Sequence, residues 1–105
     1  RVRKREMNII STDCETHIRL MVDGRVDTNT SPQLQAAILA AFQKKKDVVV
    51  DFLNVKYISS AGLRALLIGQ KTAASKRGSM KLTNVSSLVQ EILDMSGFSQ
   101  ILVIE

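Results

Sequence analysis

Apolar and polar residues alternate along several short stretches of the chain, a pattern typical of β-strands. Residues 8–12 and 16–23 flank a polar turn, and apolar and polar side chains largely alternate in the second stretch. These two stretches predict an antiparallel hairpin. Residues 48–52 form a nearly continuous apolar run, as expected of a strand buried on both faces, so we place it centrally in a sheet. Residues 80–83 and 101–104 predict two further strands.

Three other stretches place apolar residues at helical spacing. The first helix is predicted to begin near Ser31, where Thr30 and Gln33 match a capping box. It is predicted to end in the lysines of residues 44–46, whose positive charge opposes the negative end of the helix dipole. The second helix is predicted at about residues 60–77.

Glycines mark the ends of the second and third predicted helices. Gly78 follows the second helix and suits a left-handed residue just beyond it. The third helix is predicted to begin at Ser87 and to stop at Gly97. Its apolar stripe is predicted to face the core and consists of Leu88, Ile92 and Met95.

The predicted order of elements is β-β-α-β-α-β-α-β. Strands joined through helices run parallel, and the leading hairpin is antiparallel, so the sheet is predicted to be mixed. We therefore expect one α/β domain with helices packed on a mixed sheet. Gly24 is predicted to end the second strand, and a loop at residues 53–59 to lead from the central strand to the second helix.

The basic charge of the chain is concentrated at its start. The net charge is +5, but four basic residues lie in residues 1–6 against one acidic residue. The remaining 11 basic and 9 acidic residues have a net charge of +2. We interpret residues 1–6 as a tag or linker remnant and residues 7–105 as the domain. An arm that binds nucleic acid is the alternative, disfavoured because no basic stripe continues into the rest of the chain. The few aromatic residues also argue against base stacking.

The composition argues against metal and cofactor chemistry. Cys14 is the only cysteine and His17 the only histidine, so neither a disulfide nor a zinc site is expected. No apolar run approaches membrane-spanning length, so membrane insertion is not expected. We predict a cytoplasmic protein with no bound cofactor and no metal.

Polar residues follow three of the predicted strands, where ligand sites of α/β sheets gather. Asp27 and Thr28 lie beyond the second strand, and Asn84 lies beyond the fourth. Asp51 is predicted to close the third strand, with Ser60 further along at the start of a helix. Because parallel strands end at the same edge of the sheet, we expect these residues to converge. Ser60 is predicted to cap the helix with its hydroxyl.

The central part of the chain resembles a known family. Residues 48–52 (VVVDF) and 55–67 (VKYISSAGLRALL) resemble the signature of the STAS domain, the fold of bacterial anti-sigma factor antagonists. Weaker similarities lie at residues 24–27 (GRVD) and 93–98 (LDMSGF). The resemblance covers roughly residues 7–105. Many members carry aspartate where this chain has Ser59.

The resemblance implies a regulatory function rather than an enzymatic one. It implies that Ser60 is phosphorylated by an anti-sigma factor that is also a serine kinase, and that a phosphatase of the PP2C type resets the switch. The unphosphorylated protein would capture the anti-sigma factor. Asp51 and Asn84 would support the site. The residues expected to contact the partner are Asp27, Thr28, Ser59, Ser60, Gly62, Leu63 and Arg64.

Other interpretations of the same residues stay open. The domain is alternatively a non-phosphorylated scaffold, or a regulatory domain of a larger signalling or transport complex. Asp27 alternatively organises its own loop, Asp51 alternatively caps a strand end, and Asn84 is alternatively a turn residue. An enzyme with Ser60 as nucleophile is disfavoured, because no histidine base is available and the flanking residues lack the Gly-x-Ser-x-Gly elbow.

Overall fold

Five strands form one mixed sheet in a computed structural model that describes residues 7–105. β1 pairs antiparallel with β2, and β2 to β5 run parallel in the order β1-β2-β3-β4-β5. This arrangement confirms the predicted hairpin, the mixed sheet and the central place of the third strand. The assignment of residues 1–6 to a tag or linker lies outside the described residues. The strands are β1 (Asn8–Asp13), β2 (Ile18–Val26), β3 (Asp47–Ile58), β4 (Ser79–Thr83) and β5 (Val103–Ile104).

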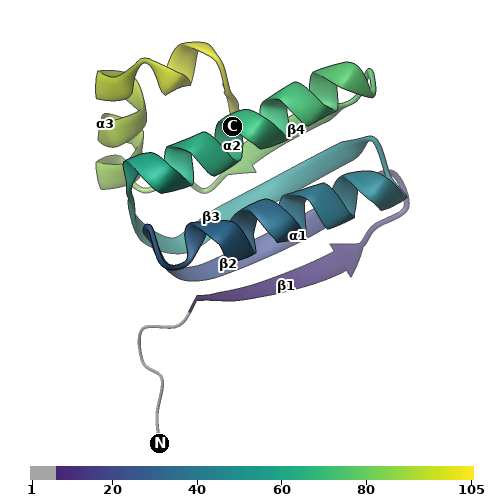
Figure 1. Cartoon of the computed structure of the whole chain (residues 1–105), viewed down its shortest axis with the longest axis horizontal. Helices are drawn as coiled ribbons and strands as arrows, with labels where there is room; N and C mark the ends of the chain where they lie inside the picture. Colours follow the sequence, from purple (N-terminus) through teal and green to yellow (C-terminus); the bar gives the residue numbers. More distant parts are fainter. Residues whose placement is uncertain (1–6) are drawn as a thin grey trace, which may run out of the picture.

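Two helices lie side by side over the sheet (Figure 1). α1 (Ser31–Lys44) connects β2 to β3, and α2 (Ser60–Ser75) connects β3 to β4. Because crossovers between parallel strands are right-handed, two successive crossovers in the same direction place both helices on the same face. α3 (Ser87–Ser96) packs against β3. Gly97 ends α3 in the left-handed conformation, as predicted, with φ of 83°.

The core lies between the sheet and its helices and is almost entirely aliphatic. Its large side chains alternate along the strands and recur at helical spacing on α1 and α2. The largest fully buried apolar side chains are Phe42, Phe52, Ile18, Leu20, Leu34, Ile38, Ile58, Leu66, Met80, Leu82, Leu93 and Val22.

The structure corrects the predicted inner face of the third helix. Val89 and Leu93 are buried, whereas Leu88 is 51% exposed and Met95 is 82% exposed. Of the predicted stripe only Ile92 packs against the core, and it is partly buried. Both stripes of α3 are apolar, so spacing alone could not decide which one faces the sheet.

The predicted loop at residues 53–59 is wrong, because β3 continues to Ile58. β2 likewise continues through Gly24 to Val26, and Gly24 takes a φ of 129° within it. Two shifts of register between β2 and β3 allow the pair to remain hydrogen-bonded over this length. The longer strands carry the chain directly to the start of α2.

The end of the second helix also differs from the prediction. α2 ends at Ser75, and Arg77 rather than Gly78 takes the left-handed conformation, with φ of 58°. Gly78 is required for a different reason. A Cβ atom at this position would lie 1.7 Å from the carbonyl oxygen of Lys46, so only glycine permits the two loops to pack.

Candidate functional site

Ser60 is the first residue of α2, and its side chain is exposed. The N-cap is Ser59, not Ser60 as predicted, because the Ser59 hydroxyl accepts a hydrogen bond from the Gly62 N–H at 3.4 Å. Among residues 7–105, no hydrogen bond involves the Ser60 hydroxyl. The site therefore separates two tasks, since Ser59 begins the helix and Ser60 presents a free hydroxyl. Serine and aspartate are about equally good N-cap residues, so Ser59 in place of aspartate leaves the helix start intact.

The position of Ser60 is set by the ends of β2 and β3. Val26 pairs with Ile58, and the Ser59 N–H donates to the Val26 carbonyl at 2.8 Å. Gly62 packs on the same two residues, because a Cβ atom there would lie 2.6 Å from side-chain atoms of both Ile58 and Val26. The start of α2 is thus held against Val26 and Ile58, the last residue pair of the two strands, by a hydrogen bond and by close packing.

Asp27 organises the loop that faces Ser60 beyond β2. Its Oδ1 accepts hydrogen bonds from the Asn29 N–H at 2.9 Å and the Thr30 N–H at 3.1 Å, and its Oδ2 lies 3.5 Å from Nε of Arg25. Partial burial raises the pKa of Asp27, but these hydrogen bonds and the Arg25 charge outweigh it and hold the pKa below its usual value. Asp27 is ionised and already paired at neutral pH.

Thr30 belongs to this loop and does not cap α1 with its side chain. Its hydroxyl accepts from the Asp27 N–H at 2.9 Å and donates to the Arg25 carbonyl at 2.7 Å. The predicted capping box with Gln33 is therefore wrong, because the loop uses the Thr30 hydroxyl instead. Thr28 lies at the exposed tip of the loop.

Arg25 joins the Asp27 loop to the end of β3. Its guanidinium lies 4.2 Å from the centre of the Tyr57 ring, a cation–π geometry, and pairs with Asp27. Sequence reasoning missed both Arg25 and Tyr57. Both lie inside the segments that resemble the family signature, Arg25 two residues before Asp27 and Tyr57 two residues before Ser59, but their contact depends on the register of β2 against β3.

Asp51 lies away from Ser60, in the middle of β3. It pairs with Met21 and Thr83, whereas Ile58 pairs with Val26, five β2 residues further on. At about 3.3 Å per residue this separates Asp51 from the Ser60 end by roughly 16 Å. The prediction that Asp51 closes the strand and converges on Ser60 is wrong, because the strand continues beyond it. It does not cap a strand end either.

Asp51 instead anchors a polar cluster in which it is the only buried member, because the Arg19 side chain is 37% exposed and Asn84 is exposed. Asp51 is 2% exposed, and its Oδ1 accepts from the Leu53 N–H at 2.9 Å and from the Asn84 amide at 3.1 Å. The Arg19 guanidinium pairs with Oδ2. Burial raises the pKa of Asp51, but the bonds from Leu53, Asn84 and Arg19 outweigh it and leave the pKa below its usual value. We call Asp51, Arg19 and Asn84 the Asp51 cluster.

The predicted site residues therefore divide into three groups. Asp51 and Asn84 belong to the Asp51 cluster. Gly62 is buried and Leu63 is only 7% exposed, so both build the start of α2 and offer almost no surface to a partner. The predicted residues that share the Ser60 end and expose side chains, wholly or partly, are Asp27, Thr28, Ser59, Ser60 and Arg64.

A family model described as Mlab, STAS domain matches residues 12–104. The chain belongs to the STAS domain family. BtrV of Bordetella bronchiseptica, named as a candidate anti-sigma factor antagonist, is 35% identical to this STAS domain over 81 residues. That match covers 76% of this chain and 70% of BtrV.

Solved structures share the fold of this STAS domain. An anti-sigma factor antagonist from Mycobacterium paratuberculosis has a TM-score of 0.84 at 19% identity and covers 95% of this chain and 86% of its own. The Bacillus protein SpoIIAA, in its unphosphorylated form, has a TM-score of 0.78 at 17% identity and covers 93% of this chain and 88% of its own. These likenesses confirm the predicted α/β fold.

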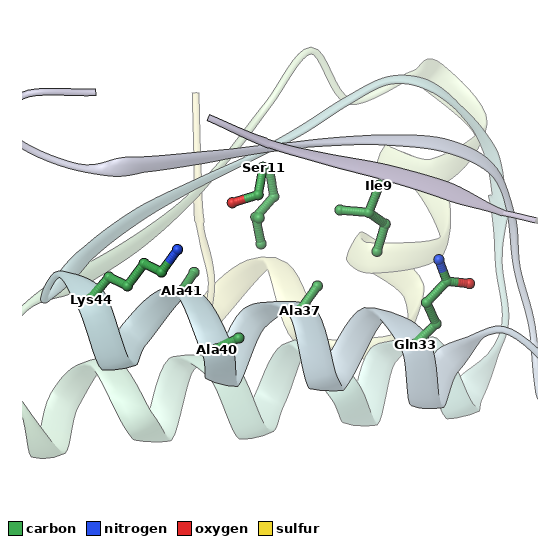
Figure 2. Close-up of a pocket in the computed structure, with 8 residues that line it drawn as sticks. Ile9, Ser11, Gln33, Ala37, Ala40, Ala41 and Lys44 are labelled. Carbon is green, nitrogen blue, oxygen red and sulfur yellow. The ribbon is translucent and has the colours of Figure 1, made fainter. Parts of the chain in front are cut away.

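Two surface grooves flank α1 of the STAS domain. Figure 2 shows Ile9 and Ser11 of β1 pointing toward the alanines of α1, in a groove of about 310 Å³ with Lys44 at one end. A second groove of about 380 Å³ lies between the start of α1 and the start of α2 and includes Ala61 and Arg64. Only the second groove adjoins Ser60.

The described residues contain no group of three histidine, cysteine or acidic side chains placed to hold a metal ion. No helix within residues 7–105 has the length and apolarity needed to span a membrane.

Proposed function

We propose that this STAS domain is a cytoplasmic anti-sigma factor antagonist that is switched by phosphorylation of Ser60. When unphosphorylated, it binds an anti-sigma factor that is also a serine kinase. The observation that carries the proposal is the exposed Ser60 hydroxyl, which makes no hydrogen bond within residues 7–105. Its neighbours Ala61 and Gly62 have no bulky side chain to shield it from the active site of another protein.

The phosphoryl transfer requires little from the domain itself. The kinase binds ATP, and the Ser60 Oγ attacks the γ-phosphorus and displaces ADP. The hydroxyl proton passes to a base of the kinase. A phosphatase of the PP2C type later hydrolyses the phosphoester with water, which restores the hydroxyl and releases inorganic phosphate. The domain contributes the acceptor oxygen and the surface that the kinase recognises.

The expected effect of the phosphate is to block an interface without changing the fold. It adds about −1.5 to −2 charges at neutral pH to a surface formed by Asp27, Thr28, Ser59 and Arg64. A partner surface complementary to the neutral hydroxyl would have to desolvate this charge. SpoIIAA, whose fold this domain shares, is known in an unphosphorylated and a phosphorylated form, which supports such a switch here.

Phosphorylation assays test the first part of the proposal. The domain is incubated with ATP and each anti-sigma factor kinase of the source genome, and the modified residue is mapped by mass spectrometry. One kinase is expected to label the wild type and Ser59→Ala but not Ser60→Ala. Labelling that persists in Ser60→Ala would contradict the proposal.

Binding assays test the second part. Ser60→Asp is expected to weaken capture of the kinase at least about tenfold, because a charge at an interface must be desolvated. Glu15→Gln, a charge change in the exposed turn between β1 and β2, at the opposite end of β2 from Ser60, serves as the control and is expected to bind like the wild type. Equal binding by Ser60→Asp and wild type, together with no labelling, would favour a non-phosphorylated scaffold or regulatory domain.

A further inference from the structure

We propose that a phosphate on Ser60 is held within the domain by Arg64. Phosphorylation would then remove two groups from the partner-binding surface, the hydroxyl of Ser60 and the guanidinium of Arg64. The inference rests on the proposed function for the presence of the phosphate. It does not depend on which kinase adds it.

Helix geometry brings the two side chains together. Ser60 is the first residue of α2, and Arg64 follows four residues later, so both lie on one side of the helix about one turn apart. Long side chains in a helix lean toward its N-terminus and cover the preceding turn. The groove that Arg64 lines also includes Ala61, which belongs to that turn. Both side chains are exposed and can meet without displacing any core residue.

Arg64 is also available for a new partner. No carboxylate among residues 7–105 forms an ion pair with Arg64. Arg25, the other arginine near this end, is already paired with Asp27 and stacked on Tyr57. An unpaired guanidinium binds phosphate through two parallel N–H···O bonds, which is a stronger arrangement than a single charge contact.

The other charges near α2 do not oppose this pairing strongly. The ionised carboxylate of Asp27 is already paired with Arg25, and the carboxylate of Asp51 is roughly 16 Å away and paired with Arg19. α1 has no charged residue before Lys44. α3 has exposed Glu91 and Asp94, and Asp94 accepts a hydrogen bond from Gln90 at 2.9 Å.

The exposed Lys56 of β3 lies four residues before Ser60 in the sequence and adds positive charge near this end. The positive charges near Ser60 therefore favour the doubly charged form of the phosphate. Of these groups only Arg64 has a guanidinium one helical turn from Ser60.

The experiment installs phosphoserine at position 60 by genetic encoding, so that no kinase is needed. The second ionisation of the phosphate is followed by ³¹P NMR in the whole chain with Arg64 present, in Arg64→Gln and in Arg64→Lys. Arg64→Gln is expected to raise the midpoint of this titration by at least about 0.3 pH units, because a cation one helical turn away stabilises the dianion. Arg64→Lys is expected to restore part of the shift.

Lys71→Gln is the matched control. Lys71 is exposed on α2 and lies two turns beyond Arg64. Lys71→Gln therefore removes the same charge as Arg64→Gln, but at a distance of roughly 16 Å from Ser60. In Lys71→Gln the phosphate is expected to titrate with the same midpoint as in the phosphorylated protein that keeps both Arg64 and Lys71. Equal titrations for Arg64→Gln and Lys71→Gln would overturn the inference.

Thermal unfolding provides an independent second measurement. The phosphorylated domain is expected to have a higher midpoint than the unmodified one, and Arg64→Gln is expected to lose that gain. A gain of the same size in Arg64→Gln would also contradict the role of Arg64. Failure of every kinase to label Ser60 would leave both measurements unchanged, so it would count against the proposed function and not against this pairing.

Discussion

Asp27 and Asp51 are two carboxylates that each follow a buried valine directly in the sequence, but their surroundings in the fold differ. Asp51 is 2% exposed and is bound by groups from β2, β3 and the turn after β4. The side chain of Asp27 is 30% exposed and is bound by residues of its own loop. The Asp51 cluster therefore joins three neighbouring strands that are far apart in the sequence, whereas the Asp27 loop shapes a surface beside Ser60.

The largest expected effect is on the Asp51 cluster. Asp51→Ala is expected to lower the free energy of unfolding by about 2–4 kcal/mol, because it leaves Arg19, the Asn84 amide and the Leu53 N–H without their acceptor. Asp27→Ala is expected to cost less and to act mainly on partner binding. Urea denaturation of both variants measures the difference, and equal losses of stability would remove the distinction between the two carboxylates.

The loss of stability at acid pH tests the role of Asp51 in this comparison. The pKa of Asp51 is lower in the folded protein than its usual value, so its contribution is fully present above about pH 4 and is lost as the pH falls through the folded pKa. The wild type is therefore expected to lose more stability than Asp51→Asn between pH 6 and pH 3. Parallel curves for the two proteins, measured by urea denaturation at each pH, would show that the ionised carboxylate contributes nothing.

Gly62 tests how tightly the Ser60 end is joined to the sheet. Gly62→Ala is expected to cost about 1–3 kcal/mol, because its Cβ would lie 2.6 Å from side-chain atoms of Ile58 and Val26. Gly97→Ala, which meets no atom within 4 Å but has a φ of 83°, is expected to cost only about 1 kcal/mol of backbone strain. Thermal unfolding compares the two, and an unchanged midpoint for Gly62→Ala would disprove the close packing.

The smallest effects separate the two adjacent serines. Ser59→Ala is expected to lower stability by about 0.5–1 kcal/mol, since it removes the N-cap of α2, and Ser59→Asp is expected to retain it. Ser60→Ala is expected to change stability by less than about 0.5 kcal/mol, because the Ser60 hydroxyl makes no hydrogen bond among residues 7–105. A greater loss of stability for Ser60→Ala than for Ser59→Ala would contradict the assignment of Ser59 as the N-cap and Ser60 as the phosphate acceptor.

Sequence patterns predicted the elements of the fold better than their ends and faces. Each predicted strand and helix exists, since apolar periodicity follows directly from which side chains are buried. The stripe chosen for α3 was wrong because Leu88 and Met95 are as apolar as Val89 and Leu93. The loop predicted at residues 53–59 was wrong because pairing with β2 extends β3 through polar residues.

For the candidate site, the sequence by itself determined that a small-residue turn with two serines begins a helix after a buried strand. Local chemistry decides this, because hydroxyl residues favour helix starts and small residues leave a surface bare. Only the tertiary structure decided which serine caps the helix and which carboxylate lies beside it. Both depend on the register of β2 against β3, which places Val26 at Ile58 and Met21 at Asp51. Register arises from packing over the whole sheet, so no local pattern carries it.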